Sequence, residues 1–287
     1  MKFDRVGETG PGTRMKNAGH NRPRLVLDSV EKRFARPDGE IVTALSDVSM
    51  SVEAHTFVAL IGPSGCGKTT VLRIANGLIQ PDNGAVTIAG SAPKPGPETG
   101  FVFQEFRLIP WATVQANVEF ALEVLPLSRA ERAERARSYL DLVGLSRSAQ
   151  SYPGQLSGGM KQRVALARAL ASEPEILLMD EPFANLDAQT RELMQSELLH
   201  IWMRHKPTVL FVTHSVDEAL LLADRIVLMG TGRVLETFDV DIERPRNLEA
   251  TRSDARFIAM RDDLWARIRD LVLSDPQSEF YGRNLGG

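Results

Sequence analysis

Short runs rich in apolar residues, the last of which alternates with polar residues, lie near the beginning of the chain and are typical of β-strands. Three such runs lie within residues 24–52, and a Pro-Asp-Gly turn at 37–39 separates the first two. The runs are Leu25–Leu27, Ile41–Leu45 and Val48–Val52. They predict short antiparallel strands. Two further strands are predicted over 86–88 and 101–103, separated by a proline-rich loop at 91–97 that excludes a helix.

Later apolar runs lack this alternation and are typical of strands covered on both faces. They occupy Ile176–Met179 and Val209–Val212, and a long helix is predicted between them over roughly 187–205. Two runs within 226–235, joined by Gly-Thr-Gly, predict a final hairpin. Buried strands that alternate with covering helices predict an α/β fold with a parallel sheet.

Two segments have a helical pattern of a different kind. Residues 128–136 are rich in Arg, Glu and Ala, which predicts solvated helices in a subdomain of about residues 105–165, inserted within the main fold. Residues 254–273 place four apolar residues on one face of an amphipathic helix that packs on the body. These residues are Phe257, Leu264, Ile268 and Leu271.

The pattern divides the chain into three parts. Residues 1–22 combine four glycines with scattered charges and predict a flexible tail. Residues 23–240 form the main domain, and residues 241–287 form a helical extension. That extension is either a packing element or an effector site.

The sequence GPSGCGKTT follows the apolar run Phe57–Ile61 and precedes a helical run, so it matches a phosphate-binding loop in full. Free backbone N–H groups and the positive end of a helix meet at such a loop. We expect Lys68 to reach the β- and γ-phosphates of a nucleoside triphosphate and Thr69 to bind Mg²⁺. The expected contact residues are Gly62, Pro63, Ser64, Gly65, Cys66, Gly67, Lys68, Thr69 and Thr70.

Two carboxylates end the apolar run that begins at Ile176, so they lie at the edge of the sheet where α/β folds bind ligands. Asp180 is expected to orient water on Mg²⁺, and Glu181 to act as general base on the attacking water. The alternative is that Glu181 only caps the turn before Pro182.

A second anion site is predicted where Ser157, Gly158 and Gly159 begin a helix. Two such sites in one chain serve the same nucleotide only if the second reaches another molecule. The sequence LSGGMKQR around these residues resembles the signature of ATP-binding cassette (ABC) ATPases. In that family two subunits hold ATP between the phosphate loop of one and the signature of the other.

The resemblance covers residues 24–240 and implies a P-loop ABC nucleotide-binding domain with a mixed sheet core, an antiparallel β subdomain and an inserted helical subdomain. It implies that Gln104 contacts Mg²⁺ and water and that His214 contacts the γ-phosphate. It also implies that Asp187 couples the two sites and that Phe34, in place of a more usual tyrosine, stacks on adenine. The implied reaction is ATP hydrolysis with Mg²⁺.

Gln104 is followed by large apolar residues, Phe106, Leu108, Ile109 and Trp111. This segment either docks on an integral-membrane permease or forms the core of the helical subdomain; as a whole it favours docking. Together with the tail around 261–265, it looks like the nitrate/sulfonate/taurine branch of bacterial ABC importers. The resemblance implies the energy-coupling subunit of an importer for a small anion, with two copies on permease subunits that a substrate-binding protein supplies.

Composition changes this picture little. The chain of 287 residues is 43% hydrophobic with a net charge of −3, so it has no basic footprint and we expect no nucleic-acid partner. One cysteine, Cys66, favours a reducing compartment, where it is either a space-filler or an alkylation-sensitive position. No run approaches the ~18 apolar residues of a spanning helix.

Together with the resemblance to importer ATPases, this leads us to expect a peripheral protein on the cytoplasmic face of the inner membrane. The alternative is a soluble ABC ATPase of the DNA repair or translation type.

Overall fold

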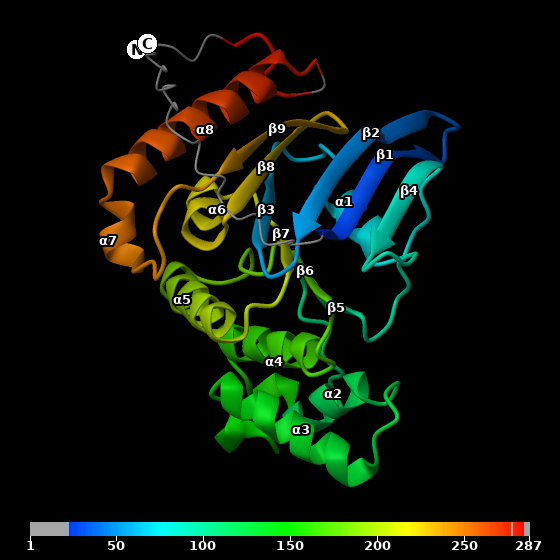
Figure 1. Ribbon diagram of the computed structural model, residues 1–287, viewed down its shortest axis with the longest axis vertical. Helices are drawn as coiled ribbons and strands as arrows, with labels where there is room; N and C mark the ends of the chain where they lie inside the picture. Colours follow the sequence, from blue (N-terminus) through cyan, green and yellow to red (C-terminus); the bar gives the residue numbers. More distant parts are fainter. Residues whose placement is uncertain (1–22, 277, 284–287) are drawn as a thin grey trace, which may run out of the picture.

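A computed structural model of the chain describes residues 23–276 and 278–283, so the tail predicted over 1–22 lies outside the described residues. Two sheets organise the upper part of the molecule in Figure 1. The larger has six strands in the order β5-β6-β7-β3-β8-β9, and the smaller has three in the order β2-β1-β4. The strands are β1 (Pro23–Ala35), β2 (Ile41–Glu53), β3 (Phe57–Ile61), β4 (Asn83–Ile88), β5 (Thr99–Val102), β6 (Ile176–Asp180), β7 (Val209–Val212), β8 (Arg225–Gly230) and β9 (Arg233–Asp239).

The larger sheet is parallel from β5 to β8, and only β9 runs antiparallel as the second arm of the predicted hairpin. Strands β3 and β7 are apolar and buried along their length, and so is β6 as far as Met179. The smaller sheet and α1 cover one face of the larger sheet, and helices cover the other. This arrangement confirms the predicted α/β class with a mixed sheet. It also brings the carboxyl ends of β3, β6 and β7 to one edge, where α/β folds bind ligands.

Helix α1 lies between the two sheets, and the remaining helices surround the other face and the lower end (Figure 1). Helices α2, α3 and α4 pack together below the sheet, and α8 runs past α6 at the top. The helices are α1 (Lys68–Ala75), α2 (Val114–Ala121), α3 (Arg129–Leu142), η1 (Ser146–Ser148), η2 (Pro153–Gln155), α4 (Gly158–Leu170), α5 (Ala188–His205), α6 (Val216–Leu222), α7 (Leu248–Arg252) and α8 (Ala255–Ser274).

The antiparallel region differs from the sequence prediction in two respects. The strand predicted over 25–27 is much longer, because β1 extends from Pro23 to Ala35 and so includes Phe34. The runs 41–45 and 48–52 are not two strands but one continuous strand, β2. Asp47 adopts a left-handed backbone with φ 58°, and the register between β1 and β2 shifts across this stretch. A bulge therefore bends the ladder without ending the strand.

The helices predicted over 187–205 and 254–273 lie within one residue of their predicted bounds, whereas the helical pattern over 128–136 continues to Leu142 as α3. Asp187 caps α5, and the capping box of Ser128 and Glu131 begins α3. In α8, Phe257 and Leu264 are buried against α6 and the main core, as the apolar stripe predicts. The short helix α7 has no counterpart in the prediction, because five residues are too few to show a periodic pattern.

Candidate functional site

The phosphate-binding loop lies between β3 and α1, and two of its glycines are required by close contacts. Gly62 and Gly67 have φ of 150° and 103°, in the region that favours glycine. A Cβ at Gly62 would lie 2.3 Å from the carbonyl oxygen of Met229, and one at Gly67 would lie 2.6 Å from that of Ala44. Gly67 is the N-cap of α1 and provides no side chain to cap it. The first N–H groups of this helix therefore have no side-chain cap and can bind an anion in the loop.

The Lys68 side chain folds back into this loop and is buried. Its amine donates to the carbonyl oxygens of Gly62 and Pro63, both at 2.8 Å, and lies 3.7 Å from Cys66 Sγ. Burial raises the pKa of the Cys66 thiol, against the lowering effect of Lys68. Cys66 is therefore a protonated space-filler, and the ammonium of Lys68 is held where a phosphate oxygen can replace a carbonyl.

Thr69 and Asp180 lie together at the edge of the sheet and offer oxygen ligands of the kind that Mg²⁺ prefers. The Thr69 hydroxyl donates to Asp180 Oδ1 at 3.1 Å. Burial is the largest effect on Asp180 and raises its pKa, although the Thr69 hydrogen bond lowers it. Among the described residues no three acidic, His or Cys side chains gather into a cage. This donor set suits Mg²⁺, which keeps waters and substrate oxygens as its other ligands.

Glu181 and His214 end neighbouring strands and lie against each other. His214 Nδ1 is 3.2 Å from Glu181 Oε2, and the backbone N–H of Glu181 donates to Val212 at 3.0 Å. Glu181 adopts φ 44°, a conformation that costs a non-glycine residue about 1–3 kcal/mol. The strained backbone aims this carboxylate at the edge shared with Asp180. The Glu181 carbonyl also accepts from the Ala184 N–H at 3.1 Å in the turn that follows, so the general-base role stays a prediction beside the alternative of a turn cap.

The segment after β5 is fixed by two side chains from the helices below. Asn117 is fully buried and bonds both the N–H and the C=O of Ile109. The Arg168 guanidinium donates to the carbonyl oxygens of Phe106 and Arg107, at 3.0 and 2.7 Å. Asn185 holds the start of this segment, donating to the Gln104 carbonyl at 3.0 Å.

Comparison with known proteins decides the family. Residues 45–184 match the ABC transporter family model. An uncharacterized ABC transporter ATP-binding protein of Methanocaldococcus jannaschii is 46% identical over 90% of this chain and 96% of its own length. The nitrate import ATP-binding protein NrtD of Synechococcus elongatus is 44% identical, covering 83% of this chain and 89% of its own. The bicarbonate transport ATP-binding protein CmpD of the same species is 42% identical, covering 85% and 89%.

The chain belongs to the ABC transporter ATP-binding family. It is an ATPase subunit of a transporter, and the resemblance predicted from the sequence is confirmed. A solved structure agrees: a dimeric ATP-binding cassette in a post-hydrolysis state bound to ADP and phosphate has a TM-score of 0.68 and 35% identity. That match covers 76% of this chain and all of the other.

The ABC signature begins α4, as predicted, with Ser157 as N-cap accepting from the Met160 N–H. Ser157 and Gly158 are exposed, whereas Gly159 is buried. Gly159 packs so close to α5 that a Cβ there would lie 2.5 Å from the Thr190 side chain. Asp187 caps α5 by accepting from the Thr190 N–H at 3.0 Å, which lowers its carboxyl pKa. No polar contact among the described residues joins these positions to the phosphate loop of the same chain.

Phe34 lies near the end of β1, paired with Val42, and is 40% exposed. Lys32 Nζ lies 5.6 Å from the centre of its ring. The exposed ring offers a face to a stacking partner, and its role in adenine binding stays a prediction.

The C-terminal extension lies beside the phosphate loop. A cavity of about 760 Å³ has the phosphate-loop residues 63–66 on one side and residues from 271–276 and 278–280 on the other. The helical pattern of α8 predicted packing, but no local signal indicates which loop its end approaches.

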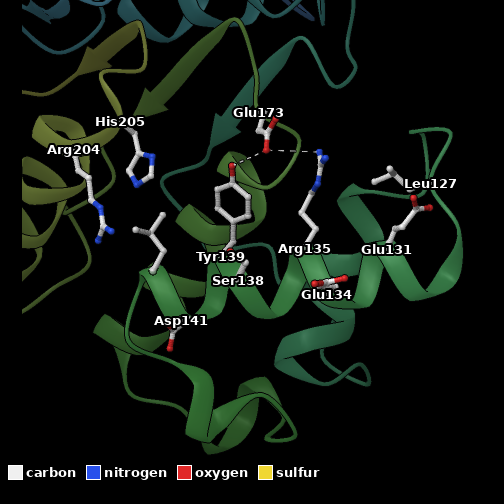
Figure 2. Close-up of a pocket in the computed structure, with 11 residues that line it drawn as sticks. Leu127, Glu131, Glu134, Arg135, Ser138, Tyr139, Asp141, Glu173, Arg204 and His205 are labelled. Atoms are coloured by element: carbon white, nitrogen blue, oxygen red, sulfur yellow. Dashed lines mark hydrogen bonds and ion pairs between the residues drawn. The ribbon is translucent and has the colours of Figure 1, made fainter.

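A second cavity, of about 580 Å³, lies between α3 and the end of α5 and contains none of the predicted site residues (Figure 2). Tyr139 projects from α3 toward Glu173 and donates to it at 3.3 Å, with Arg135 beside the same carboxylate (Figure 2). Burial raises the pKa of Tyr139 to about 12. These contacts fasten α3 to the loop before β6.

Proposed function

We propose that this ATPase is the energy-coupling subunit of an importer for a small anion. Two copies would act on permease subunits at the cytoplasmic face of the inner membrane, supplied by a substrate-binding protein. The relatives NrtD and CmpD, named for nitrate and bicarbonate, support an anion of this size. In the part of the chain that the structure describes, no helix is long and apolar enough to cross a membrane. A membrane partner would therefore have to supply the pathway.

The geometry supports a hydrolytic role for the residues at the sheet edge. Glu181 would take a proton from water, and His214 Nδ1, 3.2 Å from Glu181 Oε2, would hold its orientation. Thr69 and Asp180 would hold Mg²⁺, which neutralises charge on phosphate oxygens when bound. Lys68 would exchange its two carbonyl contacts for phosphate oxygens. Gln104, exposed at the start of the adjoining segment, would report the state of the site.

The exposed signature supports the action of two copies. Ser157 and Gly158 present a helix N-terminus to solvent and have no contact with the phosphate loop of their own chain. A second copy would place this N-terminus on the γ-phosphate side of the first. ATP binding would then close the pair and hydrolysis would reopen it.

One observation carries the link to a permease. Trp111 is 81% exposed, although the segment before it is rigidly held by Asn117 and Arg168. Phe106 and Leu108 pack partly against the core, so they serve the helical subdomain, whereas Trp111 does not. Tryptophan is enriched among the residues that carry binding energy at protein interfaces, which supports docking at Trp111.

Co-purification from membranes tests this function. The tagged chain would be purified from detergent-solubilised membranes of its own organism, and the co-purifying proteins identified. We expect a polytopic permease in stoichiometric amount with the wild type and much less with Trp111→Ala. Trp265→Ala, at a tryptophan 52% exposed on α8, is the matched control and should retain the permease. Recovery of the chain alone, or with ribosomes or DNA, would instead support the soluble alternative.

A further inference from the structure

The backbone on both sides of His214 is fixed by one buried hydroxyl. Thr213 is 1% exposed, and its Oγ1 accepts from the Ser215 N–H at 3.0 Å. The same hydroxyl donates to Glu218 Oε2 at 2.6 Å. The Thr213 hydroxyl therefore joins the two residues on either side of His214, Thr213 and Ser215.

Glu218 is held in turn from the opposite side. It is 6% exposed on α6, and its Oε1 accepts from Gln195 Nε2 on α5 at 3.1 Å. The sequence Ser215-Val216-Asp217-Glu218 is typical of a capping box, in which the glutamate would bond the Ser215 N–H. Here the Thr213 hydroxyl occupies that N–H, and the carboxylate turns into the interior instead.

A buried carboxylate is costly, so its retention needs an explanation beyond helix packing. Among the described residues, the Glu218 carboxylate has no ion-pair partner within 4 Å. Its hydrogen-bond partners are the Thr213 hydroxyl and the Gln195 amide. What the arrangement does provide is a rigid link from α5 through Gln195, Glu218 and Thr213 to the backbone of His214. The His214 ring then meets Glu181 at 3.2 Å.

We propose that Thr213 and Glu218 are positioning residues for ATP hydrolysis, which hold His214 in contact with Glu181. This inference rests on the proposed role of His214. It predicts that loss of the Thr213 hydroxyl or of the Glu218 acceptor displaces the imidazole and slows hydrolysis without weakening ATP binding, because neither residue lies at the phosphate loop.

The chain offers a matched control at the other end of the same strand. Thr208 and Thr213 flank β7, both are buried, and the Thr208 hydroxyl accepts from the His55 N–H at 3.0 Å. Thr208→Val and Thr213→Val each remove one hydroxyl and leave one backbone N–H unpaired, and Thr213→Val also removes the donor to Glu218 Oε2. We expect the larger loss in melting temperature from Thr213→Val, so both variants are assayed well below their melting temperatures, where a difference in activity reports position and not stability.

The decisive measurement is the steady-state ATPase activity of the full chain with ATP and Mg²⁺. We expect Thr213→Val and Glu218→Ala to lower kcat by roughly 10- to 100-fold with KM for ATP within about twofold. Thr208→Val should keep kcat within about twofold of the wild type. Glu218→Gln should restore most of kcat, since its carbonyl oxygen still accepts from Thr213. Gln195 Nε2 now donates to this side chain, so its amide has to flip in the variant, which turns Oε1, without a partner among the described residues, toward the new amide N–H.

A nucleotide-free readout accompanies the kinetics. In ¹⁵N NMR spectra of the imidazole groups, assigned with His214→Ala, the His214 signal should shift toward that of the exposed His205 in Thr213→Val but not in Thr208→Val. Equal kcat in the two valine variants, or an unmoved His214 signal, would overturn the inference. Wild-type kcat in His214→Ala would instead overturn the proposed role of His214, so the two failures are distinguishable.

Discussion

The Nδ1 atom of His214 lies 3.2 Å from Oε2 of Glu181, although 33 residues separate them in the sequence. The contact forms because β6 and β7 are adjacent parallel strands, so residues that follow them reach the same edge. A left-handed backbone at Glu181, with φ 44°, completes the approach. The chemistry proposed for this ATPase depends on that pair.

Glu181→Gln tests the general base. The amide cannot accept a proton from water, so we expect ATP turnover to fall by about 10²–10⁴-fold. ATP should still bind, because Lys68 and the loop N–H groups are untouched, and the variant should accumulate as an ATP-bound dimer in light scattering. Ordinary turnover by this variant would remove Glu181 from the mechanism.

Gly67→Ala tests the conformation of the phosphate loop. Its Cβ would lie 2.6 Å from the Ala44 carbonyl, at a φ of 103° that an alanine rarely adopts. We expect a loss of about 2–4 kcal/mol in nucleotide-free stability, measured by urea unfolding. Gly65→Ala is the control: its φ is 82°, but no atom lies within 4 Å of its Cβ. Equal losses in the two variants would show that the contact with Ala44 is unimportant.

Glu218→Gln should change the pH dependence of stability. Burial raises the pKa of this carboxyl above its ordinary value of 4.5, against the hydrogen bond from Thr213. A raised pKa means that the folded state favours the proton, so this contribution is complete below pH 4.5 and is lost as pH rises through the folded pKa. Glutamine has no group that ionises, so the variant does not lose stability in this way as pH rises.

The free energy of unfolding of Glu218→Gln should therefore increase relative to the wild type from pH 4.5 upward, measured by urea unfolding at several pH values. Glu134→Gln, at an exposed carboxylate on α3, should show no comparable trend. A difference between Glu218→Gln and the wild type that is constant with pH would contradict the predicted burial effect.

Asn117→Ala tests the support of the segment that ends at Trp111. The Asn117 side chain bonds the N–H and C=O of Ile109 and the carbonyl oxygens of Ala112 and Thr113. Its loss leaves buried backbone groups unpaired, and we expect a cost of about 2–4 kcal/mol in urea unfolding. Gln115→Ala, on the same helix but only partly buried, should cost less than about 1 kcal/mol.

Several features of the fold followed from local patterns. The phosphate loop, the caps at Ser157 and Asp187, and the stripe of α8 are each specified within a few residues of sequence. The continuity of β2 was not predicted, because the bulge at Asp47 depends on its partner strand. The roles assigned to the site residues stay predictions, although the structure brings Thr69 to Asp180 and Glu181 to His214.

The link through Thr213 and Glu218 was beyond sequence reasoning for a physical reason. The local spacing of Ser215 and Glu218 is typical of a capping box, in which the glutamate bonds the Ser215 N–H. In the structure, that N–H donates instead to the Thr213 hydroxyl, and the amide of Gln195 donates to Glu218. These groups become neighbours only when β7, α5 and α6 pack together.

Uptake in proteoliposomes tests the central claim most directly. The complex recovered through the tagged chain would be reconstituted with its substrate-binding protein, with nitrate or bicarbonate offered on the side of that protein and ATP on the side of the ATPase. We expect the anion to accumulate with the wild-type chain and not with Glu181→Gln. ATP hydrolysis without uptake of any small anion, or uptake that persists with Glu181→Gln, would contradict the account.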